Sequence, residues 1–303
     1  VGEAAGGEGQ ACRLIHGAGD GLPGLSADLY PPFAVVHAYG RALLPLGRQL
    51  AEALRAYAGC RGAVVKLRSR GAAGRQQVAS AVVGEAAPEK LVVREGTLRF
   101  EVHPTGGLNV GLFTDMREHR RRLGELAAGR AVLNGFAYTG SISVACARGG
   151  ATRVTSVDLS SGVLRWAADN LRLNGVDPDA AHLTGQAADV GRFLTDAERG
   201  GQRWDLVILD PPTFSAARGA PFSIERDYPQ LVARACAVIG AGGLLWLAAN
   251  TRGVALADIA RAGLRRARRD AAVLETGGLP ADHPTLPAQP DDRYLSTCLL
   301  RLS

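Results

Sequence analysis

One stretch decides the fold class: residues 132–160, which read VLNGFAYTGSISVACARGGATRVTSVDLS. An apolar strand runs into a glycine turn at Gly140, and a segment with helical spacing of its apolar residues follows. A second apolar strand then ends at Asp158. Strand, turn, helix and strand in this order are typical of a βαβ unit, in which the two strands run parallel. The stretch therefore predicts a parallel sheet.

The same alternation of strands and helical segments continues through the second half of the chain. Segments over 181–185, 204–210 and 242–250 are expected to be further strands, with helical segments between them. Two final apolar stretches, 271–277 and 293–302, suit an antiparallel pair that closes the sheet. We therefore predict an α/β fold with a doubly wound, mostly parallel sheet of seven strands.

The first hundred residues have a different rhythm and predict a small α+β domain. Its order is strand, strand, helix, strand, strand, with the last pair forming a hairpin. The expected elements are strands over 25–30 and 33–39, a helix over 46–58, a strand over 62–69 and a hairpin over 90–102. The predicted domains are 1–104 and 105–303.

Composition excludes several classes of protein. The 303 residues contain no apolar run of the ~20 residues that span a bilayer, and the first residues lack the order of a signal peptide. We therefore expect a cytoplasmic protein without a membrane partner. The five cysteines are scattered and form no C-x-x-C pair, which argues against a disulfide framework and against a metal site.

The net charge of +6 comes almost entirely from arginine. A GC-rich genome explains this excess as well as a polyanionic partner does. Arginine neutralises phosphates and stacks on bases, and here it is concentrated in three clusters, at 66–70, 117–122 and 261–269. Each cluster is also consistent with a solvated helix face, so charge alone leaves both interpretations open.

Acidic residues follow three successive strands of the predicted sheet. Asp158 lies 18 residues after Gly140, a spacing typical of a carboxylate that binds the ribose of a nucleoside cofactor. Asp189 and Asp210 follow the next two strands. The turn is not G-x-G-x-x-G, which disfavours a dinucleotide and suits S-adenosylmethionine, because that cofactor has no pyrophosphate. The alternative is structural: Gly140 makes a tight turn, and Asp158 and Asp189 cap helices.

The segment LDPPTFS, residues 209–215, resembles the Asp-Pro-Pro-aromatic motif of S-adenosylmethionine-dependent nucleic-acid methyltransferases. Pro211 and Pro212 hold the chain extended, so that Phe214 can lie against a flat base, a contact worth roughly 1–3 kcal/mol. Asp210 can accept hydrogen bonds from a base edge or from the cofactor's amino group. The alternative is a cis-proline turn with Phe214 in the core.

Further segments resemble one family, the bacterial large-subunit ribosomal RNA methyltransferases. They follow in the family's order over almost the whole chain from residue 13. Besides the opening stretch they are IHGAGDGLPGLSADLY (15–30), GLNVGLFTDMREHRRRL (107–123), AADNLRLNG (167–175) and DHPTLPAQPDDRYL (282–295). The resemblance implies a class I methyltransferase domain behind a small N-terminal domain, S-adenosylmethionine as cofactor and large-subunit rRNA as partner.

The resemblance also implies roles for individual residues. Asp115 and Arg117 match residues near the methionine end of the cofactor, where Arg117 could pair with its carboxylate. Asp158 would bind the ribose and Asp189 the adenine amino group. The predicted cofactor-binding set is Asp115, Arg117, Asn134, Phe136, Tyr138, Thr139, Gly140, Asp158, Leu159, Ser160, Asn170, Ala188, Asp189 and Asp210. The predicted catalytic set, on the substrate side of the site, is Asp210, Pro211, Pro212, Phe214 and Asn250.

The position of Asn250 distinguishes two chemistries. Methylation of carbon 5 of cytosine requires a thiolate that first attacks the ring, and the branch that performs it carries a cysteine where this chain has Asn250. The segments DPPTFS, FSIERDY and ANTRG instead resemble the guanine-N7 branch. N7 already presents a lone pair in line with the methyl group, so positioning alone suffices. A helix-capping role for Asn250 is the structural alternative.

Three hypotheses follow. The first is an RNA methyltransferase that modifies guanine N7 of large-subunit rRNA, with cytosine C5 as the alternative product. Many family members carry an additional RNA-binding module before the first domain, and we expect this chain to lack it. A small-molecule or peptide methyltransferase is therefore the second hypothesis, and a cofactor-binding RNA chaperone without turnover is the third. The sequence leaves a homodimer open.

Overall fold

The computed structural model describes residues 10–70, 76–107, 109–212, 223–253, 255–289 and 292–303. The chain forms two compact units. The N-terminal unit comprises Val1–Arg117 together with Pro280–Asp292, and the C-terminal unit comprises Glu118–Leu279 and Arg293–Ser303. The domain limits expected from the sequence stay a prediction, and the two units are described separately below.

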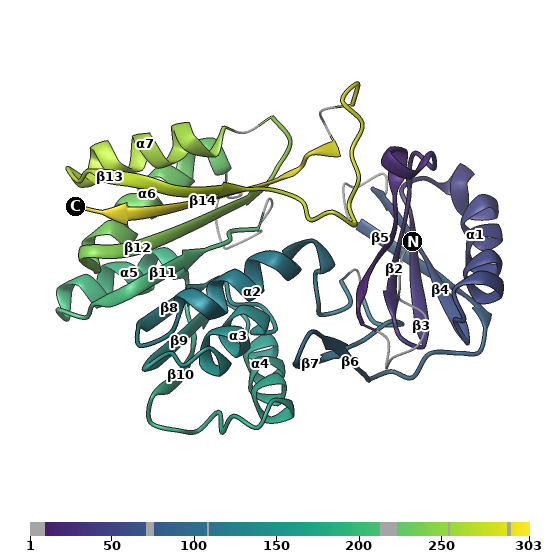
Figure 1. The fold of residues 1–303 in the computed structure, drawn as a ribbon, viewed down its shortest axis with the longest axis horizontal. Helices are drawn as coiled ribbons and strands as arrows, with labels where there is room; N and C mark the ends of the chain where they lie inside the picture. Colours follow the sequence, from purple (N-terminus) through teal and green to yellow (C-terminus); the bar gives the residue numbers. More distant parts are fainter. Residues whose placement is uncertain (1–9, 71–75, 108, 213–222, 254, 290–291) are drawn as a thin grey trace. The chain divides into compact units, whose positions relative to one another are not determined.

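The N-terminal unit contains a five-stranded sheet with one long helix on it (Figure 1). Helix α1 packs Ala51 and Leu54 against the sheet residues Ala27, Val36 and Val65, and all five side chains are buried. The hairpin expected over 90–102 is observed as β6–β7, which form a separate two-stranded sheet and turn at Gly96. The elements are β1 (Cys12–His16), β2 (Leu25–Tyr30), β3 (Phe33–Ala38), α1 (Leu44–Tyr57), β4 (Gly62–Arg70), β5 (Gln76–Gly84), β6 (Leu91–Glu95) and β7 (Leu98–Val102).

Two strands of this sheet were missing from the sequence prediction. Strand β1 pairs antiparallel with β2, and β5 pairs antiparallel with β4. Both lie at the edges of the sheet, in the order β1-β2-β3-β4-β5. Edge strands are stabilised by pairing with one neighbour and carry a weak apolar pattern, which explains why QQVASAVVG at 76–84 gives little strand signal.

The C-terminal unit contains a seven-stranded sheet in the order β10-β9-β8-β11-β12-β14-β13. Strands β8 to β12 pair parallel with one another, and β14 runs antiparallel to both of its neighbours. The predicted α/β class is therefore confirmed. The strands are β8 (Ala131–Gly135), β9 (Arg153–Asp158), β10 (Leu183–Ala187), β11 (Trp204–Leu209), β12 (Ile239–Asn250), β13 (Ala271–Gly277) and β14 (Leu295–Leu302).

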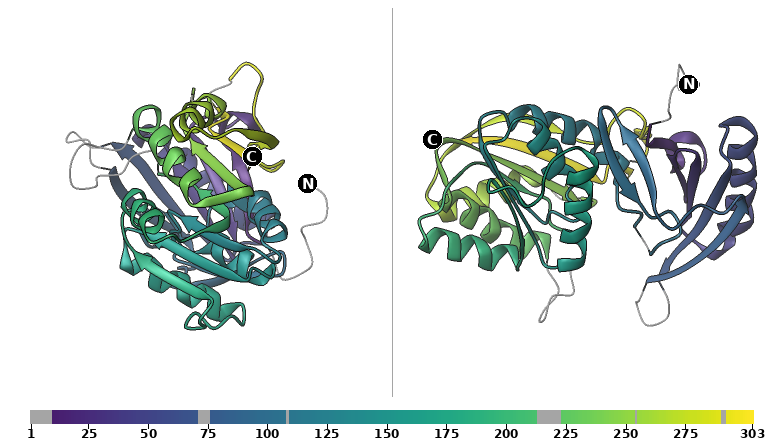
Figure 2. Two further views of the ribbon diagram at one scale, coloured as in Figure 1. Left: turned by 90° about the vertical axis from the view of Figure 1, so that its left-hand side faces the viewer. Right: turned by 90° about the horizontal axis from the view of Figure 1, so that it is seen from below.

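Helices cover this sheet in two groups (Figures 1 and 2). Helices α5, α6 and α7 pack side by side, and α3 packs beside α4 against β8, β9 and β10. The helices are α2 (Arg117–Leu126), α3 (Ser141–Arg148), α4 (Ser161–Leu173), α5 (Val190–Arg199), α6 (Ile224–Ala237) and α7 (Leu256–Ala267). Over the residues that the structure describes, every helix falls short of the length and apolarity that crossing a bilayer requires.

Candidate functional site

The predicted site residues of the C-terminal unit converge at the carboxyl edge of its parallel strands. Gly135 at the end of β8 is in register with Val157 of β9 and with Leu209 of β11. Asp158 at the end of β9 is in register with Ala187 of β10. The strand order reverses at β8, which lies between β9 and β11 although it precedes both in the chain. A doubly wound sheet binds its ligands at such a switch point.

Asp158 joins the loops that follow β8 and β9. Its Oδ2 accepts a hydrogen bond from the backbone N–H of Tyr138 at 3.0 Å, and its Oδ1 accepts one from the N–H of Ser160, also at 3.0 Å. Its own carbonyl accepts a third from the N–H of Ala188, after β10. One residue therefore connects the ends of three strands. Neither of the hydrogen bonds that its carboxylate accepts caps α4. Ser160 performs that role, because its side chain accepts a hydrogen bond from the N–H of Val163.

The turn after β8 has an unusual backbone. Phe136 has φ of 63°, Tyr138 of 48° and Gly140 of 73°, so three residues within five are left-handed. This conformation costs a residue with a Cβ roughly 1–2 kcal/mol, and such strain clusters at functional sites. Gly140 is required for a second reason, because a Cβ placed on it would lie 2.5 Å from the Cβ of Ala167 on α4.

A buried polar network supports this turn from behind. Asn134 Nδ2 donates to Ser143 Oγ at 2.8 Å, and Ser143 Oγ lies 2.7 Å from Ser156 Oγ. Asn170 Nδ2 donates to the carbonyl oxygen of Thr139 at 2.9 Å. Asn134 and Asn170 are both buried. Their amides therefore hold the turn in place, and their contact with a cofactor stays a prediction.

The third acidic residue, Asp189, is the N-cap of α5. Its Oδ1 accepts a hydrogen bond from the backbone N–H of Arg192 at 2.8 Å, as the structural alternative expected. A capping carboxylate can also face a ligand, because a second oxygen extends from the same carbon. Leu159, between Asp158 and Ser160, is 63% exposed and presents an apolar surface beside this edge of the sheet.

A tyrosine that the sequence analysis did not single out holds the ends of β11 and β12. Tyr228 lies in α6 and is fully buried, and its hydroxyl reaches the carbonyl oxygens of Leu209 at 2.8 Å and Ala248 at 2.9 Å. Burial, and next the negative charge of Asp210, raise the pKa of Tyr228 well above its ordinary value. The hydroxyl therefore stays protonated and donates beside Asp210.

The Asp-Pro-Pro segment begins directly after β11. Asp210 is partly buried, Pro211 is buried and Pro212 is exposed, while Phe214 lies outside the described residues. Asn250 is the exposed last residue of β12, where it pairs with Leu295 of β14. The structure thus brings the strand ends before Asp210 and Asn250 together through Tyr228.

Two further predicted residues belong to the N-terminal unit. Asp115 is buried in a short 3-10 helix, Thr114–Met116. Arg117 Nη1 donates to Asp282 Oδ2 at 2.9 Å. Although burial opposes it, hydrogen bonds from His283 and Arg117 lower the pKa of Asp282 far below its usual value. Arg117 therefore has a carboxylate partner within its own unit, and its predicted pairing with a cofactor stays a prediction.

None of the five cysteines is a ready nucleophile. Burial raises the pKa of every one of them, that of Cys146 to about 12 and that of Cys236 to about 11. Cys146 lies inside α3, Cys236 inside α6 and Cys298 inside β14. A thiol must ionise before it can attack a pyrimidine ring, so these thiols do not suit that chemistry.

Comparison with known proteins identifies the family. Residues 36–284 match the family model described as S-adenosylmethionine-dependent methyltransferase. A ribosomal RNA large subunit methyltransferase of Deinococcus radiodurans is 36% identical over 262 residues, which cover 85% of this chain but only 64% of that protein. Ribosomal RNA large subunit methyltransferase I of Erwinia tasmaniensis is 31% identical over 296 residues, covering 93% of this chain and 72% of the relative.

Solved structures agree with this result. SMU.776, a methyltransferase crystallised in complex with SAH, superposes with a TM-score of 0.86 at 27% identity over 96% of this chain and 75% of its own. A methyltransferase from Streptococcus mutans gives the same TM-score at 26% identity, over 98% of this chain and 76% of its own.

Proposed function

The chain belongs to the S-adenosylmethionine-dependent methyltransferase family, and from this premise we propose that it methylates a base of large-subunit ribosomal RNA. Both sequence relatives described above are named for that RNA. This chain spans only part of each of them, so substrate and product rest on the chemistry of its own residues. Of the two base atoms considered, that chemistry favours guanine N7.

One observation carries the proposal: the Asp158 carboxylate connects the loop after β8 with the loop after β9 through two backbone N–H groups. This arrangement fixes a strained turn and an acidic edge where a nucleoside is expected to bind. In the proposal, Asp158 and Asp189 accept hydrogen bonds from the ribose and the adenine, and Leu159 covers one face of the ring. When bound, S-adenosylmethionine supplies a methyl group activated by the positive charge on sulfur.

The substrate base lies, in the proposal, against the segment that follows β11. Asp210 accepts a hydrogen bond from an amino or imino group of the base, and the two prolines keep that segment extended. The remaining task is to hold N7 about 3–3.5 Å from the methyl carbon. Methylation at N7 releases no proton and leaves a positive charge on the base. Asp210 can offset this charge without acting as a base.

The cysteines support N7 over cytosine C5. Replacing all five by alanine or serine should leave methyl transfer in place, provided that circular dichroism shows a folded protein. Loss of activity in a folded variant, restored by returning a single cysteine, would establish a covalent mechanism and overturn the N7 proposal.

Mass spectrometry tests the substrate directly. Large-subunit rRNA from a strain that lacks the gene is incubated with the protein and S-adenosylmethionine carrying a labelled methyl group, then digested to nucleosides. Labelled 7-methylguanosine is the expected product, and labelled 5-methylcytidine would overturn the choice of atom. Label that enters only small molecules or peptides would overturn the choice of RNA.

A further inference from the structure

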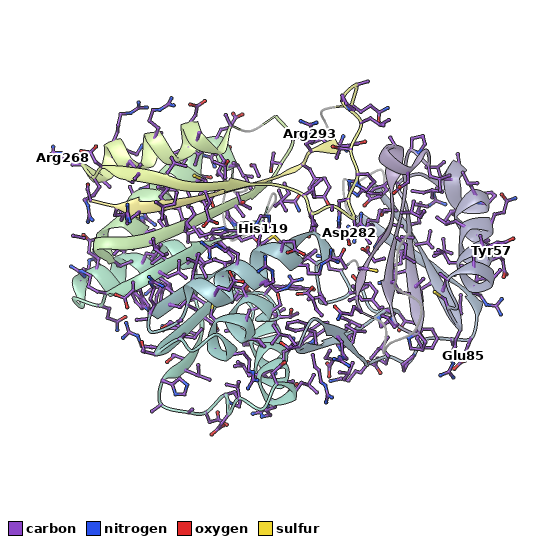
Figure 3. All side chains as sticks on the ribbon, in the orientation of Figure 1. Tyr57, Glu85, His119, Arg268, Asp282 and Arg293 are labelled. Carbon is purple, nitrogen blue, oxygen red and sulfur yellow. The ribbon has the colours of Figure 1, made fainter. Side chains whose placement is uncertain are left out.

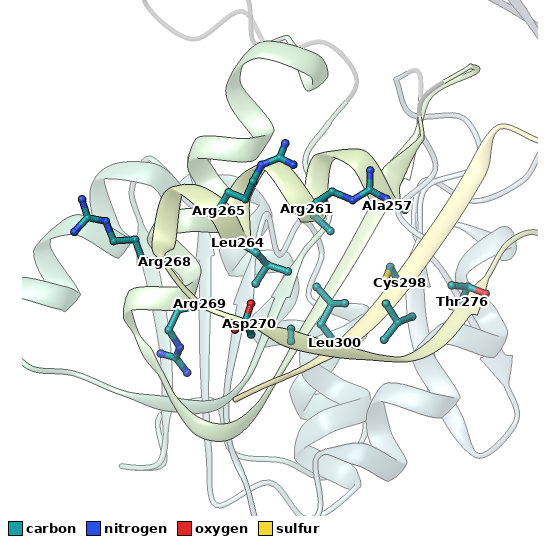
Figure 4. Close-up of a pocket in the computed structure, with 13 residues that line it drawn as sticks. Ala257, Arg261, Leu264, Arg265, Arg268, Arg269, Asp270, Thr276, Cys298 and Leu300 are labelled. Carbon is teal, nitrogen blue, oxygen red and sulfur yellow. The ribbon is translucent and has the colours of Figure 1, made fainter.

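A hollow of about 420 Å³ lies away from the strand ends, between helix α7 and the strand pair β13–β14 (Figure 4). Its volume is sufficient for a nucleotide-sized ligand. The apolar part of its lining includes Leu264 of α7, Val273 of β13, and Cys298 and Leu300 of β14. Figure 4 shows Leu264 reaching from the helix toward the strands. The hollow therefore has an apolar floor suited to a flat ring.

Arginines surround this floor. Among the residues that the structure describes, the hollow is lined by four arginines and one aspartate, Asp270. Three of them, Arg261, Arg265 and Arg268, follow each other at intervals of four and three residues, so they share one face of the helix and its end. Their guanidinium groups extend outward from α7 (Figure 4), and Figure 3 shows Arg268 at its far end. We call Arg261, Arg265 and Arg268 the α7 arginine row.

One arginine of the row has an acidic partner, and the other two have none among the described residues. Arg261 pairs with the exposed Asp258 at 2.8 Å. Within the described part of the chain, the guanidinium groups of Arg265 and Arg268 make no ion pair and no hydrogen bond, and both side chains are exposed. Exposed positive charges next to an apolar hollow fit a ligand that combines a phosphate with a ring.

We propose that this hollow and the α7 arginine row bind a single-stranded segment of the substrate RNA outside the methylated nucleotide. An unstacked base occupies the hollow, and the flanking phosphates follow the row. This inference rests on the proposed function, because it takes RNA as the polyanion. It gives the cluster at 261–269 a role that the candidate site does not supply.

Charge complementarity favours RNA over a second copy of this chain. Strand β13 is an edge strand with exposed Val273 and Leu274, so pairing with another β13 is the competing arrangement. A two-fold symmetric contact places the same patch on both sides of the interface. It would bring the two arginine rows near each other, and like charges in contact are unfavourable.

The test compares two double variants that remove the same charge. Arg265→Gln/Arg268→Gln changes the row, whereas Arg199→Gln/Arg266→Gln is the matched control. Arg266 is exposed on the same helix but does not line the hollow, and Arg199 is exposed in the last turn of α5, at the opposite end of that helix from Asp189. Binding of a fluorescein-labelled, mixed-sequence, single-stranded RNA is measured by anisotropy over a series of salt concentrations, and KM and kcat are measured with large-subunit rRNA.

In a plot of log affinity against log salt, we expect the slope of the row variant to be less steep than that of the wild type by about 1.4. Each lost phosphate contact on single-stranded RNA contributes about 0.7 to this slope. The KM of the row variant for rRNA should rise several-fold while kcat stays within about twofold, and the control should match the wild type. A row variant with the slope and KM of the control would overturn the inference. So would a wild type that is dimeric in solution and becomes monomeric only in the row variant, because the row would then serve a contact between two copies of the chain.

The same experiment separates this inference from the proposed function. If the wild type methylates rRNA and the two double variants behave alike, only the site at α7 is wrong. If the wild type binds S-adenosylmethionine by calorimetry but methylates no RNA, the proposed function fails, and the inference about the α7 site fails with it.

Discussion

The hydroxyl of Tyr228 offers the sharpest test of how the fold supports the site. Tyr228→Phe keeps the ring and leaves no cavity, so its effect comes from hydrogen bonding alone. The hydroxyl lies 2.8 Å from the Leu209 carbonyl oxygen and 2.9 Å from that of Ala248, and the side chain is fully buried. Removing it leaves buried carbonyl groups without this donor, which costs about 1–3 kcal/mol. A loss of this size should lower the Tm by roughly 2–4 °C per kcal/mol.

The consequence for activity follows from the position of Leu209. Its carbonyl group directly precedes Asp210, and Ala248 lies two residues before Asn250. Without the hydroxyl, both strand ends gain freedom, so we expect kcat for rRNA methylation to fall about tenfold, which corresponds to about 1.4 kcal/mol in the transition state. Cofactor affinity by calorimetry should change less, because the Asp158 contacts lie on β9.

Thr155→Val is the matched control. It removes the 3.2 Å hydrogen bond from Trp204 Nε1 to Thr155 Oγ1, a buried bond of the same unit that joins the first residue of β11 to the middle of β9. Chemical denaturation and steady-state kinetics are measured for both variants. The reasoning fails if Tyr228→Phe loses less than about 0.5 kcal/mol of stability, or if both variants lose stability and keep equal kcat.

Three further predictions use the same unit and its neighbour. Gly140→Ala should lower the free energy of unfolding by about 2 kcal/mol or more, because φ is 73° and the new Cβ meets Ala167. It should also weaken S-adenosylmethionine binding measured by calorimetry. A stable variant with normal affinity would contradict both effects. Asp158→Ala should also weaken that binding, whereas Asp196→Ala, an exposed carboxylate of α5, should leave it unchanged; equal affinities would remove Asp158 from the site. Finally, burial lowers the pKa of His16 to about 4 and that of His37 to about 3. Below pH ~6.5 the two histidines therefore bind protons in the unfolded chain before they do so in the folded chain. The stability of the N-terminal unit should therefore decrease as the pH is lowered below about 6.5, by on the order of 2 kcal/mol per histidine at pH 5. His37→Gln should flatten the curve of Tm against pH.

Much of the C-terminal unit follows from the sequence because its signals are local. The apolar strand expected at the start of residues 132–160 is observed as Ala131–Gly135, and the apolar stretch over 271–277 is β13 with the same limits. Asp158, Asp189 and Asp210 lie at or just after the strand ends for the same reason, while their binding roles stay predictions. A strand followed by a helix fixes which edge of a parallel sheet receives the residue after the strand.

Other features depend on contacts between residues far apart in the chain, which the apolar periodicity of the sequence does not reveal. Tyr228 meets Leu209 from 19 residues away, and its sequence neighbourhood reads as an ordinary amphipathic helix. The hydrogen bond from Tyr138 to Asp158 likewise depends on the left-handed turn, and non-glycine residues such as Phe136 and Tyr138 give no sign of positive φ in the sequence. The edge strands β1 and β5 belong with these features, since a partner strand defines them.

The path of the chain restricts how its parts can be inherited or separated. The polypeptide passes from one unit to the other three times, after Arg117, Leu279 and Asp292. Asp282 returns to accept hydrogen bonds from the backbone N–H of Arg13 at 3.1 Å and from Arg117 at 2.9 Å. A gene fragment that stops at Arg117 would encode both arginines without their carboxylate. The N-terminal unit therefore cannot be exchanged as one continuous gene segment. Recombination that replaced it would have to replace the 280–292 segment as well.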